Sequence, residues 1–169
     1  MGGAVYISNQ FKITKITHSL FVGCSANKNG GAVYCLCMKF YSCQSMYSEC
    51  FITDAMWSGQ AFMVSSNLIN VTESSAVSCP PSLNHRGSEV CILVGGAQNV
   101  QQLNSSYNIA SAYASGIATS ESVSFEMKMC TFYYNRSPNH ILALIHIRPD
   151  DEISYCNIIR NTVDTDGLL

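Results

Sequence analysis

The sequence is poor in charged residues and contains no long apolar run. Charged residues make up 12% of the 169 residues, about half of the ~25% that is usual in soluble domains. The nine Lys and Arg residues are scattered and the formal net charge is −2, which argues against a nucleic-acid partner. No stretch approaches the roughly 18–20 apolar residues of a membrane-spanning helix, and no secretory signal opens the sequence.

Hydrophobic residues, in contrast, make up 47% of the chain, which is ample for a folded core and excludes a disordered polypeptide. Their period is two rather than 3.6. Residues 123–130 read Val-Ser-Phe-Glu-Met-Lys-Met-Cys, and residues 11–14 read Phe-Lys-Ile-Thr. This alternation predicts strands with the apolar residues of each run on one buried face. No window predicts an amphipathic helix.

A glycine-led segment recurs along the chain. Gly2-Gly3-Ala4-Val5-Tyr6 returns as Gly30-Gly31-Ala32-Val33-Tyr34 after ~28 residues, a repeat length that is typical of solenoids. Further steps of nearly the same length lead to Gly59, Gly87 and Gly116. Glycine suits sharp bends and closely stacked backbones. We therefore expect the members Gly3, Gly31, Gly59 and Gly87 to lie in one column.

A second landmark alternates with the glycines. In it, an aromatic or large aliphatic residue is followed three places later by a small or polar one. The first positions are Phe21, Phe51, Tyr107, Phe132 and Ile158, and the second positions are Cys24, Asp54, Ala110, Asn135 and Asn161. Two landmarks that share one cycle indicate coils stacked in register.

The landmarks predict an all-β fold, a right-handed parallel β-helix of about five to six coils with ~28 residues each. We expect residues 1–169 to form a single domain, less regular over residues 75–104 around Pro80-Pro81. The sequence begins and ends inside repeats without a polar cap. We therefore expect it to be a fragment of a longer solenoid, with end-to-end self-association through its open coils.

The landmarks also carry a resemblance. Gly-Gly-Ala with a following apolar residue, as at residues 2–5 and 30–33, together with Phe-x-x-Asn at residues 132–135, resembles the repeat of chlamydial polymorphic membrane proteins and of trichomonad surface proteins. The resemblance covers residues 2–62 well and residues 105–161 loosely. It implies a pectin-lyase-like right-handed β-helix, an extracellular or cell-surface location, and adhesion to a host or cell-surface protein or a glycan.

Two polar residues are expected to face each other between coils. Asn135 and Asn161 are separated by about the length of one coil. In coils stacked at about 4.8 Å their amides can hydrogen-bond along the axis, because each amide carries a donor and an acceptor. This spacing predicts a structural ladder rather than a binding site.

Nine cysteines are present, and several fall about one coil apart. These are Cys24, Cys50 and Cys79, and also Cys130 and Cys156. Such columns fit buried free thiols that act as small apolar side chains, disulfides, or metal ligands. The sequence favours the first alternative and leaves the other two open.

Two acids also fall one coil apart. Glu126 and Glu152 stack in this frame, with Lys128 near both. Stacked like charges are unfavourable without a cation. An acidic outer face is where β-helix pectate lyases bind calcium or carry catalytic carboxylates, but a solvated charged face is the simpler interpretation. The chain shows no nucleophile motif and no phosphate-binding loop, so we predict no catalytic residue, metal site or cofactor.

The favoured function is therefore a non-enzymatic structural or adhesive surface module. The alternative is a carbohydrate-active β-helix, either a polysaccharide lyase or a glycoside hydrolase. Asn70 and Asn104 begin sequons and are candidate glycosylation sites. Asn135 begins a third sequon, but an inward position in the ladder would prevent it from carrying a glycan.

Overall fold

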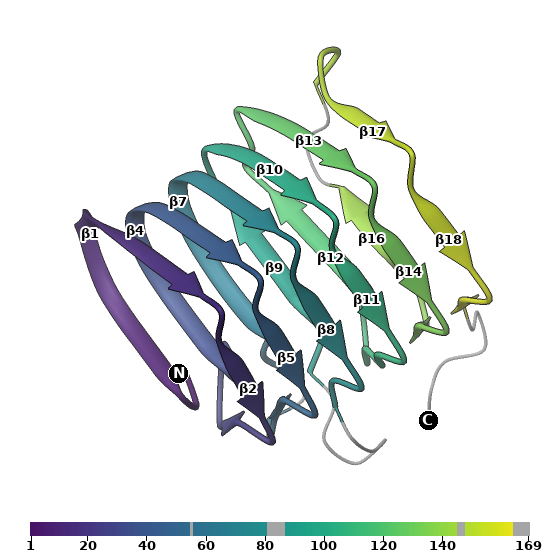
Figure 1. Ribbon diagram of the computed structural model, residues 1–169. Helices are drawn as coiled ribbons and strands as arrows, with labels where there is room; N and C mark the ends of the chain where they lie inside the picture. The colour runs from purple at the N-terminus through teal and green to yellow at the C-terminus, as the bar shows by residue number, and fades with distance from the viewer. Residues whose placement is uncertain (55, 81–86, 145–147, 164–169) are drawn as a thin grey trace.

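The computed structural model describes residues 1–54, 56–80, 87–144 and 148–163. Within these residues every regular element is a β-strand, and the strands wind into about six turns spaced by about 27 residues (Figure 1). The strands pair in parallel, and the winding is right-handed (Figure 1). The predicted fold, an all-β parallel β-helix, is confirmed. No helix in the described part is long and apolar enough to cross a membrane.

Each turn contributes strands in the same order. The first turn holds β1 (Val5–Thr17), β2 (Leu20–Val22) and β3 (Ser25–Ala26), and the second holds β4 (Val33–Cys43), β5 (Met46–Ser48) and β6 (Phe51–Ile52). The third holds β7 (Phe62–Thr72) and β8 (Ser75–Val77), and the fourth holds β9 (Cys91–Val94), β10 (Ala97–Gln101) and β11 (Asn104–Ser106). The fifth holds β12 (Ala114–Ser120), β13 (Ser124–Lys128), β14 (Thr131–Tyr133) and β15 (Arg136–Ser137). The sixth holds β16 (His140–Leu144), β17 (Glu152–Ser154), β18 (Asn157–Ile159) and β19 (Thr162–Val163).

Three legs make up each turn. The long strands β1, β4 and β7 contain the first and second legs, joined at a bend; later turns split this path into β9 and β10, β12 and β13, and β16 and β17. The third legs form a six-stranded sheet in the order β18-β14-β11-β8-β5-β2. In residues 75–104, expected to be less regular, β8 to β11 all pair with their neighbours, while residues 81–86 lie outside the described residues.

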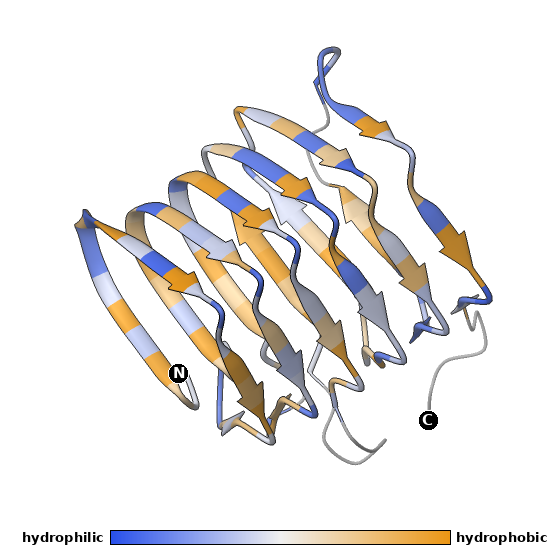
Figure 2. Ribbon diagram, viewed as in Figure 1, coloured by the Kyte–Doolittle hydropathy of each residue, from blue (hydrophilic) through white to orange (hydrophobic). Residues whose placement is uncertain are grey.

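The core consists of columns of inward-facing side chains, one from each turn. A second-leg column runs through Ile16, Ser42, Val71, Val100, Met127 and Ile153. Apolar and polar residues alternate along the strands around it (Figure 2). Parallel stacking places like positions on top of one another, so five apolar residues build most of this column. Ser42 is the exception, and its hydroxyl hydrogen-bonds the Tyr47 hydroxyl at 3.1 Å.

The predicted buried face was wrong at some positions. Thr14 and Ile16 point inward in β1, whereas Phe11 and Ile13 are exposed. The reason is an irregularity between Asn9 and Ile13, which changes the register along the strand. In residues 123–130, Phe125 and Met127 are buried as expected, but Val123 and Met129 are exposed.

The corners between legs use left-handed backbone at fixed positions. One such column follows the second legs: His18, Gln44, Glu73, Gln102, Met129 and Tyr155, with φ between 48° and 55°. The other follows the third legs: Gly23, Glu49, Ser78, Tyr107, Tyr134 and Arg160. Only one of these residues is a glycine, so stacking with neighbouring turns holds ordinary side chains in a backbone region that they rarely adopt.

The glycine column is shorter than expected and has a different register. Gly2, Gly30 and Gly59 form it, with φ of 59°, 70° and 77°. Gly3 and Gly31 lie one place later, where a Cβ on Gly31 would come 2.0 Å from the carbonyl oxygen of Gln60. The predicted alignment of Gly59 with Gly3 and Gly31 was therefore wrong by one residue.

The last two glycines of the predicted column lie elsewhere. Gly87 precedes Ser88, whose N–H donates to the Trp57 carbonyl. Gly87 therefore lies beside Trp57 and does not stack on Gly59. Gly116 lies inside β12 against the Phe132 ring. Their assignment to the repeat was wrong because turns of unequal length shift the register.

The second landmark is also partly displaced. Phe21, Phe132 and Ile158 lie in one inward column of the third leg. Phe51 and Tyr107 do not. The intervening positions are Tyr47, Ala76 and Ser105. Phe51 instead opens β6, and Tyr107 is an exposed corner residue. Residue type therefore varies along the column, and two small residues, Ala76 and Ser105, separate the rings of Tyr47 and Phe132.

Asparagines link the third leg to the next turn. The Oδ1 atoms of Asn108, Asn135 and Asn161 accept the backbone N–H groups of Cys79, Asn108 and Asn135 at 2.8, 3.0 and 2.8 Å. Their Nδ2 atoms donate to the carbonyl oxygens of Ala76, Ser105 and Phe132 at 2.9, 2.8 and 2.8 Å. The ladder thus joins amides to backbone rather than amide to amide. Cys24, Cys50 and Cys79 lie at the same position in the earlier turns.

Candidate binding surface

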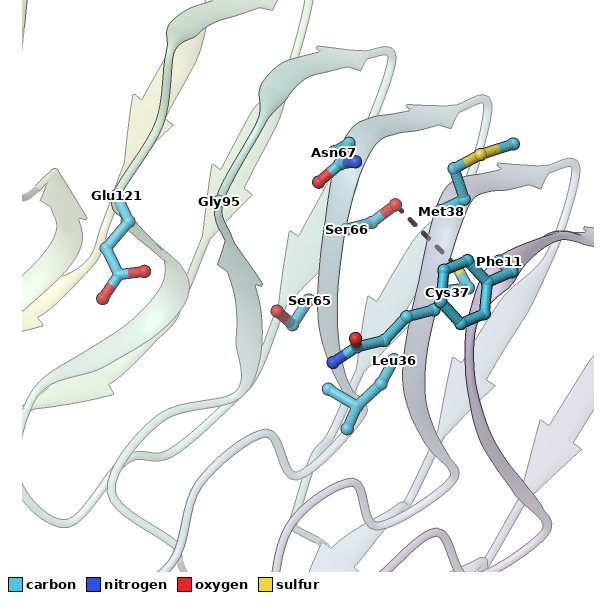
Figure 3. A pocket seen from close by; sticks show the side chains of 10 residues that line it. Phe11, Leu36, Cys37, Met38, Ser65, Ser66, Asn67, Gly95 and Glu121 are labelled. Atoms are coloured by element: carbon cyan, nitrogen blue, oxygen red, sulfur yellow. Dashed lines mark hydrogen bonds between the residues drawn. The ribbon is translucent and has the colours of Figure 1, made fainter.

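A hollow of about 500 Å³ lies at the bend between the first and second legs (Figure 3). Its lining comes from five successive turns: Gln10 and Phe11, then Leu36 to Met38, Ser65 to Asn67, Gly95, and Glu121. Figure 3 shows Phe11 at one end and Glu121 at the other, with Ser65 and Asn67 between them. With strands about 4.8 Å apart, five turns span roughly 19 Å. The hollow therefore follows the helix axis.

The position of Phe11 results from extra residues in β1. Asn9 pairs with Cys37 and Ile13 with Lys39, so residues 10–12 lie opposite Met38 alone. Extra residues on one strand have no partners on the other, so the strand bulges and their side chains leave the regular pleat. The Phe11 N–H donates to Asn9 Oδ1 at 3.2 Å, and the side chain is 85% exposed. An aromatic ring is thus held at the edge of the hollow rather than in the core.

Leu36 and Met38 add apolar surface to the lining, and most of its other side chains are polar, with one charge at Glu121. Ser66 Oγ bonds the Leu68 carbonyl at 3.0 Å and contacts Cys37 Sγ at 3.8 Å, so this hydroxyl is engaged within the protein. Asn67 and Glu121 are exposed. One aromatic ring with exposed amide and carboxylate groups offers an apolar surface together with hydrogen-bonding groups. This combination fits a neutral, hydroxyl-rich ligand.

The acids predicted to stack lie on the outer face of the second leg. Glu126 pairs directly with Glu152, and Lys128 Nζ lies 2.5 Å from Glu126 Oε1 and 3.0 Å from Glu152 Oε2. Hydrogen bonds to both carboxylates raise the pKa of Lys128, and the Lys128 ammonium lowers the pKa of Glu152. A general acid needs its carboxyl pKa raised toward neutrality. The cluster is instead an ion triad in which one ammonium bridges two carboxylates.

Two stacked tyrosine rings lie at the corner that follows the third leg. The Tyr107 and Tyr134 rings stack with centroids 5.4 Å apart and planes 5° apart. The Arg160 guanidinium lies over the Tyr134 ring, 5.7 Å from its centroid, and its Nη1 donates to the Tyr134 hydroxyl at 3.1 Å. The stack occupies three successive turns at one left-handed corner position. The Tyr133 ring contacts Tyr107 and Tyr134 edge-on, with centroids 5.7 Å and 4.5 Å away, so these rings pack on one another.

The cysteines are all free thiols, and six of the nine are buried. Disulfides, one of the alternatives left open by the sequence, are therefore not formed. Within the described residues no group of three or more His, Cys, Asp or Glu side chains is arranged to hold a metal ion. Desolvation raises the pKa of Cys130 to about 12 and also raises that of Cys91, which keeps these thiols protonated and unreactive.

The sequons differ in accessibility. Asn104 is exposed at the start of β11, and Asn70 is half-buried on the outer face of β7 between Tyr41 and Asn99. Asn135 is 1% exposed and fully engaged in the ladder. Of the three, Asn104 is the position with most room for a glycan.

Comparison of the chain with models of known protein families, with curated proteins and with solved structures finds no match. The site hypothesis therefore depends on the geometry alone. The sequence prediction brought Glu126, Lys128 and Glu152 together, as the structure does, but it did not identify the hollow. Asn9, a residue that readily bonds a nearby backbone N–H, was the one local signal of the irregularity that expels Phe11.

Proposed function

We propose that the protein is a non-enzymatic surface module that binds an extended glycan along the hollow at the bend. The observation that carries this proposal is the run of lining residues from five successive turns, which begins at the exposed Phe11 ring. A hollow that follows the axis suits a linear polymer, because each turn presents a new contact at a regular interval. A compact ligand would use one or two turns only.

The chemistry of the lining supports a sugar rather than a charged polymer. Among the described residues that form the lining, Glu121 is the one carboxylate, and no Lys or Arg contributes. The C–H face of a sugar ring can pack on Phe11, while Asn67 and Gln10 provide amide donors and acceptors for hydroxyl groups. The proposed location, at a cell surface or outside the cell, is part of the same proposal and depends on the repeat resemblance.

The proposal is tested by titrating the protein with neutral oligosaccharides of increasing length, selected from a glycan array, in a calorimeter. We expect affinity to rise with length until the hollow is filled. Phe11→Ala should weaken binding about tenfold, the equivalent of ~1.4 kcal/mol of aromatic packing. Phe11→Tyr should retain it. Tyr155→Ala removes another exposed ring, far along the chain, and should leave binding unchanged. Failure of every glycan, or an unchanged affinity in Phe11→Ala, would refute the proposal.

The carbohydrate-active alternative has one observation in its favour. Glu126 and Glu152 meet one lysine on the outer face of adjacent turns. The lowered pKa of Glu152 and the tight pairing argue against proton transfer. A calcium-dependent eliminase assay on polygalacturonate decides between the two: we expect no activity, whereas activity that Glu152→Ala abolishes would establish an enzyme.

A further inference from the structure

Two lysines flank one end of the hollow. Lys12 belongs to the bulge of β1 and directly follows Phe11, the aromatic ring at that end (Figure 3). Lys39 directly follows Met38, another residue of the lining, and pairs with Ile13 of the neighbouring strand. Because Ile13 is the residue next to Lys12 and neighbouring strands are ~4.8 Å apart, the two lysines lie close together at the bend.

These two lysines have no acidic partner among the described residues. Lys12 is exposed, Lys39 is half-buried, and neither forms a salt bridge with a described carboxylate. Residues 1–48 contain lysines but no Asp or Glu. Lys39 pairs with Leu68 in the next turn, and Glu73 lies five residues further along that strand, roughly 16 Å away. This separation is about twice the ~8 Å screening length at physiological salt, so both ammonium groups are available to an anionic group of a ligand.

The other end of the hollow carries the opposite charge. Glu121 is exposed and forms no salt bridge with a described Lys or Arg. Met38 belongs to the second turn and Glu121 to the fifth, which places three strand spacings, roughly 14 Å, between them. The lysines beside Met38 are therefore too far from Glu121 to neutralise it. The hollow has a positive and a negative end.

The middle of the hollow is uncharged. Leu36, Ser65, Asn67 and Gly95 lie in the turns between the two ends, and no described residue of this part of the lining is charged. An anionic group bound there would meet no cation. A polymer with an acid on every sugar would also bring a carboxylate against Glu121, which repels it. The charges therefore favour a ligand with a neutral body and one acidic group at the Phe11 end.

We propose that the hollow binds a linear glycan whose neutral chain ends in one acidic sugar, with the carboxylate of that sugar held by Lys12 and Lys39. The inference rests on the proposed glycan binding and names the substrate class of the same site. Each ammonium group donates a charge-assisted hydrogen bond to the carboxylate, while Phe11 packs on the neighbouring sugar ring. Because only this end attracts an anion, the glycan binds in one direction.

The experiment titrates the full chain with matched pairs of ligands in a calorimeter. Each pair consists of a neutral linear oligosaccharide, either a xylo-oligosaccharide or lacto-N-tetraose, and the same molecule with one terminal glucuronic or sialic acid. At low salt the acidic member should bind about threefold to tenfold more tightly, the equivalent of two exposed ion pairs. The gain should disappear at 1 M salt, where the screening length is only about 3 Å.

Variants of the two lysines assign the gain to this end of the hollow. Lys12→Gln and Lys39→Gln should each reduce the difference within a pair, and the double variant should abolish it. Replacing both lysines by Glu should reverse the preference. Lys28→Gln removes an equal charge at another corner, where the ammonium lies 4.9 Å from the centroid of the Trp57 ring, and should keep the full difference. Far-ultraviolet circular dichroism verifies that each variant is folded.

The outcomes separate this inference from the proposal on which it rests. Equal affinities within every pair, or a gain that survives in the double variant, would overturn the acidic end, and binding of the neutral members would still support a glycan site. Tighter binding of oligogalacturonate than of any singly acidic ligand would also overturn it, because Glu121 would then repel nothing. If only acidic members bind, and they require Lys12 and Lys39, the anion site stands and the neutral hollow fails. If neither member of any pair binds, both fall.

Discussion

At the level of single residues, the asparagine ladder places polar amides in the buried interior, where Asn108 and Asn135 are at most 1% exposed. Each amide bonds two backbone groups of the neighbouring turn. Its oxygen accepts a backbone N–H, and its nitrogen donates to a backbone carbonyl. Buried backbone groups without a partner are costly. The ladder therefore contributes to stability through the groups that it satisfies more than through amide packing.

We expect Asn135→Ala to lower the free energy of unfolding by roughly 2–4 kcal/mol, because the Asn108 N–H and the Ser105 carbonyl lose their bonds from this side chain together. Urea unfolding followed by circular dichroism measures the change. Asn104→Ala removes an exposed amide of the same type and should change stability by less than about 0.5 kcal/mol. Equal losses in the two variants would contradict a structural ladder.

Buried thiols should make the stability of the protein decrease at alkaline pH. Desolvation raises the pKa of Cys91, so the folded state keeps a proton that the unfolded chain releases above its ordinary pKa of about 8.5. Stability is fully present below that value and falls as pH rises, by up to about 1.4 kcal/mol per pH unit for one such group. We expect a negative slope in urea-derived stability between pH 8 and pH 10.

Two substitutions identify the source of that slope. Cys91→Ala should make it shallower, because one buried titrating group is gone. Val64→Ala, at a fully buried position of the same core, should lower stability by a similar amount at every pH and leave the slope unchanged. A slope that Cys91→Ala does not alter would assign the effect to other groups.

At the level of the strands and corners, glycine is needed at one turn position but not at the others. The corners after the second leg hold ordinary side chains at φ near 50°, whereas the turn before β4 contains Gly30, where a Cβ would lie 2.3 Å from the Val33 carbonyl oxygen. Crowding by the backbone, more than the sign of φ, therefore explains the recurring Gly-Gly.

Gly30→Ala and Gly23→Ala separate these two effects. Both glycines have positive φ, but a Cβ at Gly23 meets nothing within 4 Å. We expect Gly23→Ala to cost about 1 kcal/mol of stability from backbone strain alone. Gly30→Ala should cost about 3 kcal/mol or more, because β4 must also shift. Similar losses from thermal or urea unfolding would show that crowding is unimportant.

The repeat was sufficient to predict the fold, and insufficient to predict its register. Stacking requires only that like positions recur, and the glycine segment and the Phe132 to Asn135 unit revealed this. Turns differ in length: Thr14, Phe40 and Ile69 hold equivalent positions in successive turns, and the second step is longer than the first. With that freedom, Phe51 fitted the expected spacing as well as Tyr47 did, and only packing selects between them. The hollow depends on the residues expelled after Asn9, which no periodic pattern reports.

At the level of the whole molecule, each described turn packs on the turns beside it. Stability is therefore a sum of turns and of interfaces between neighbours. An interior turn such as that of β7 and β8 has two interfaces, whereas the turns of β1 and β18 have one in the described structure. The ends should therefore open first.

Amide hydrogen exchange followed by mass spectrometry tests this gradient. In dilute protein we expect strong protection in β7 and β8, and exchange about tenfold faster or more in β2 and β18, because opening an end turn breaks one interface instead of two. Uniform protection along the chain would show that the turns unfold as one unit.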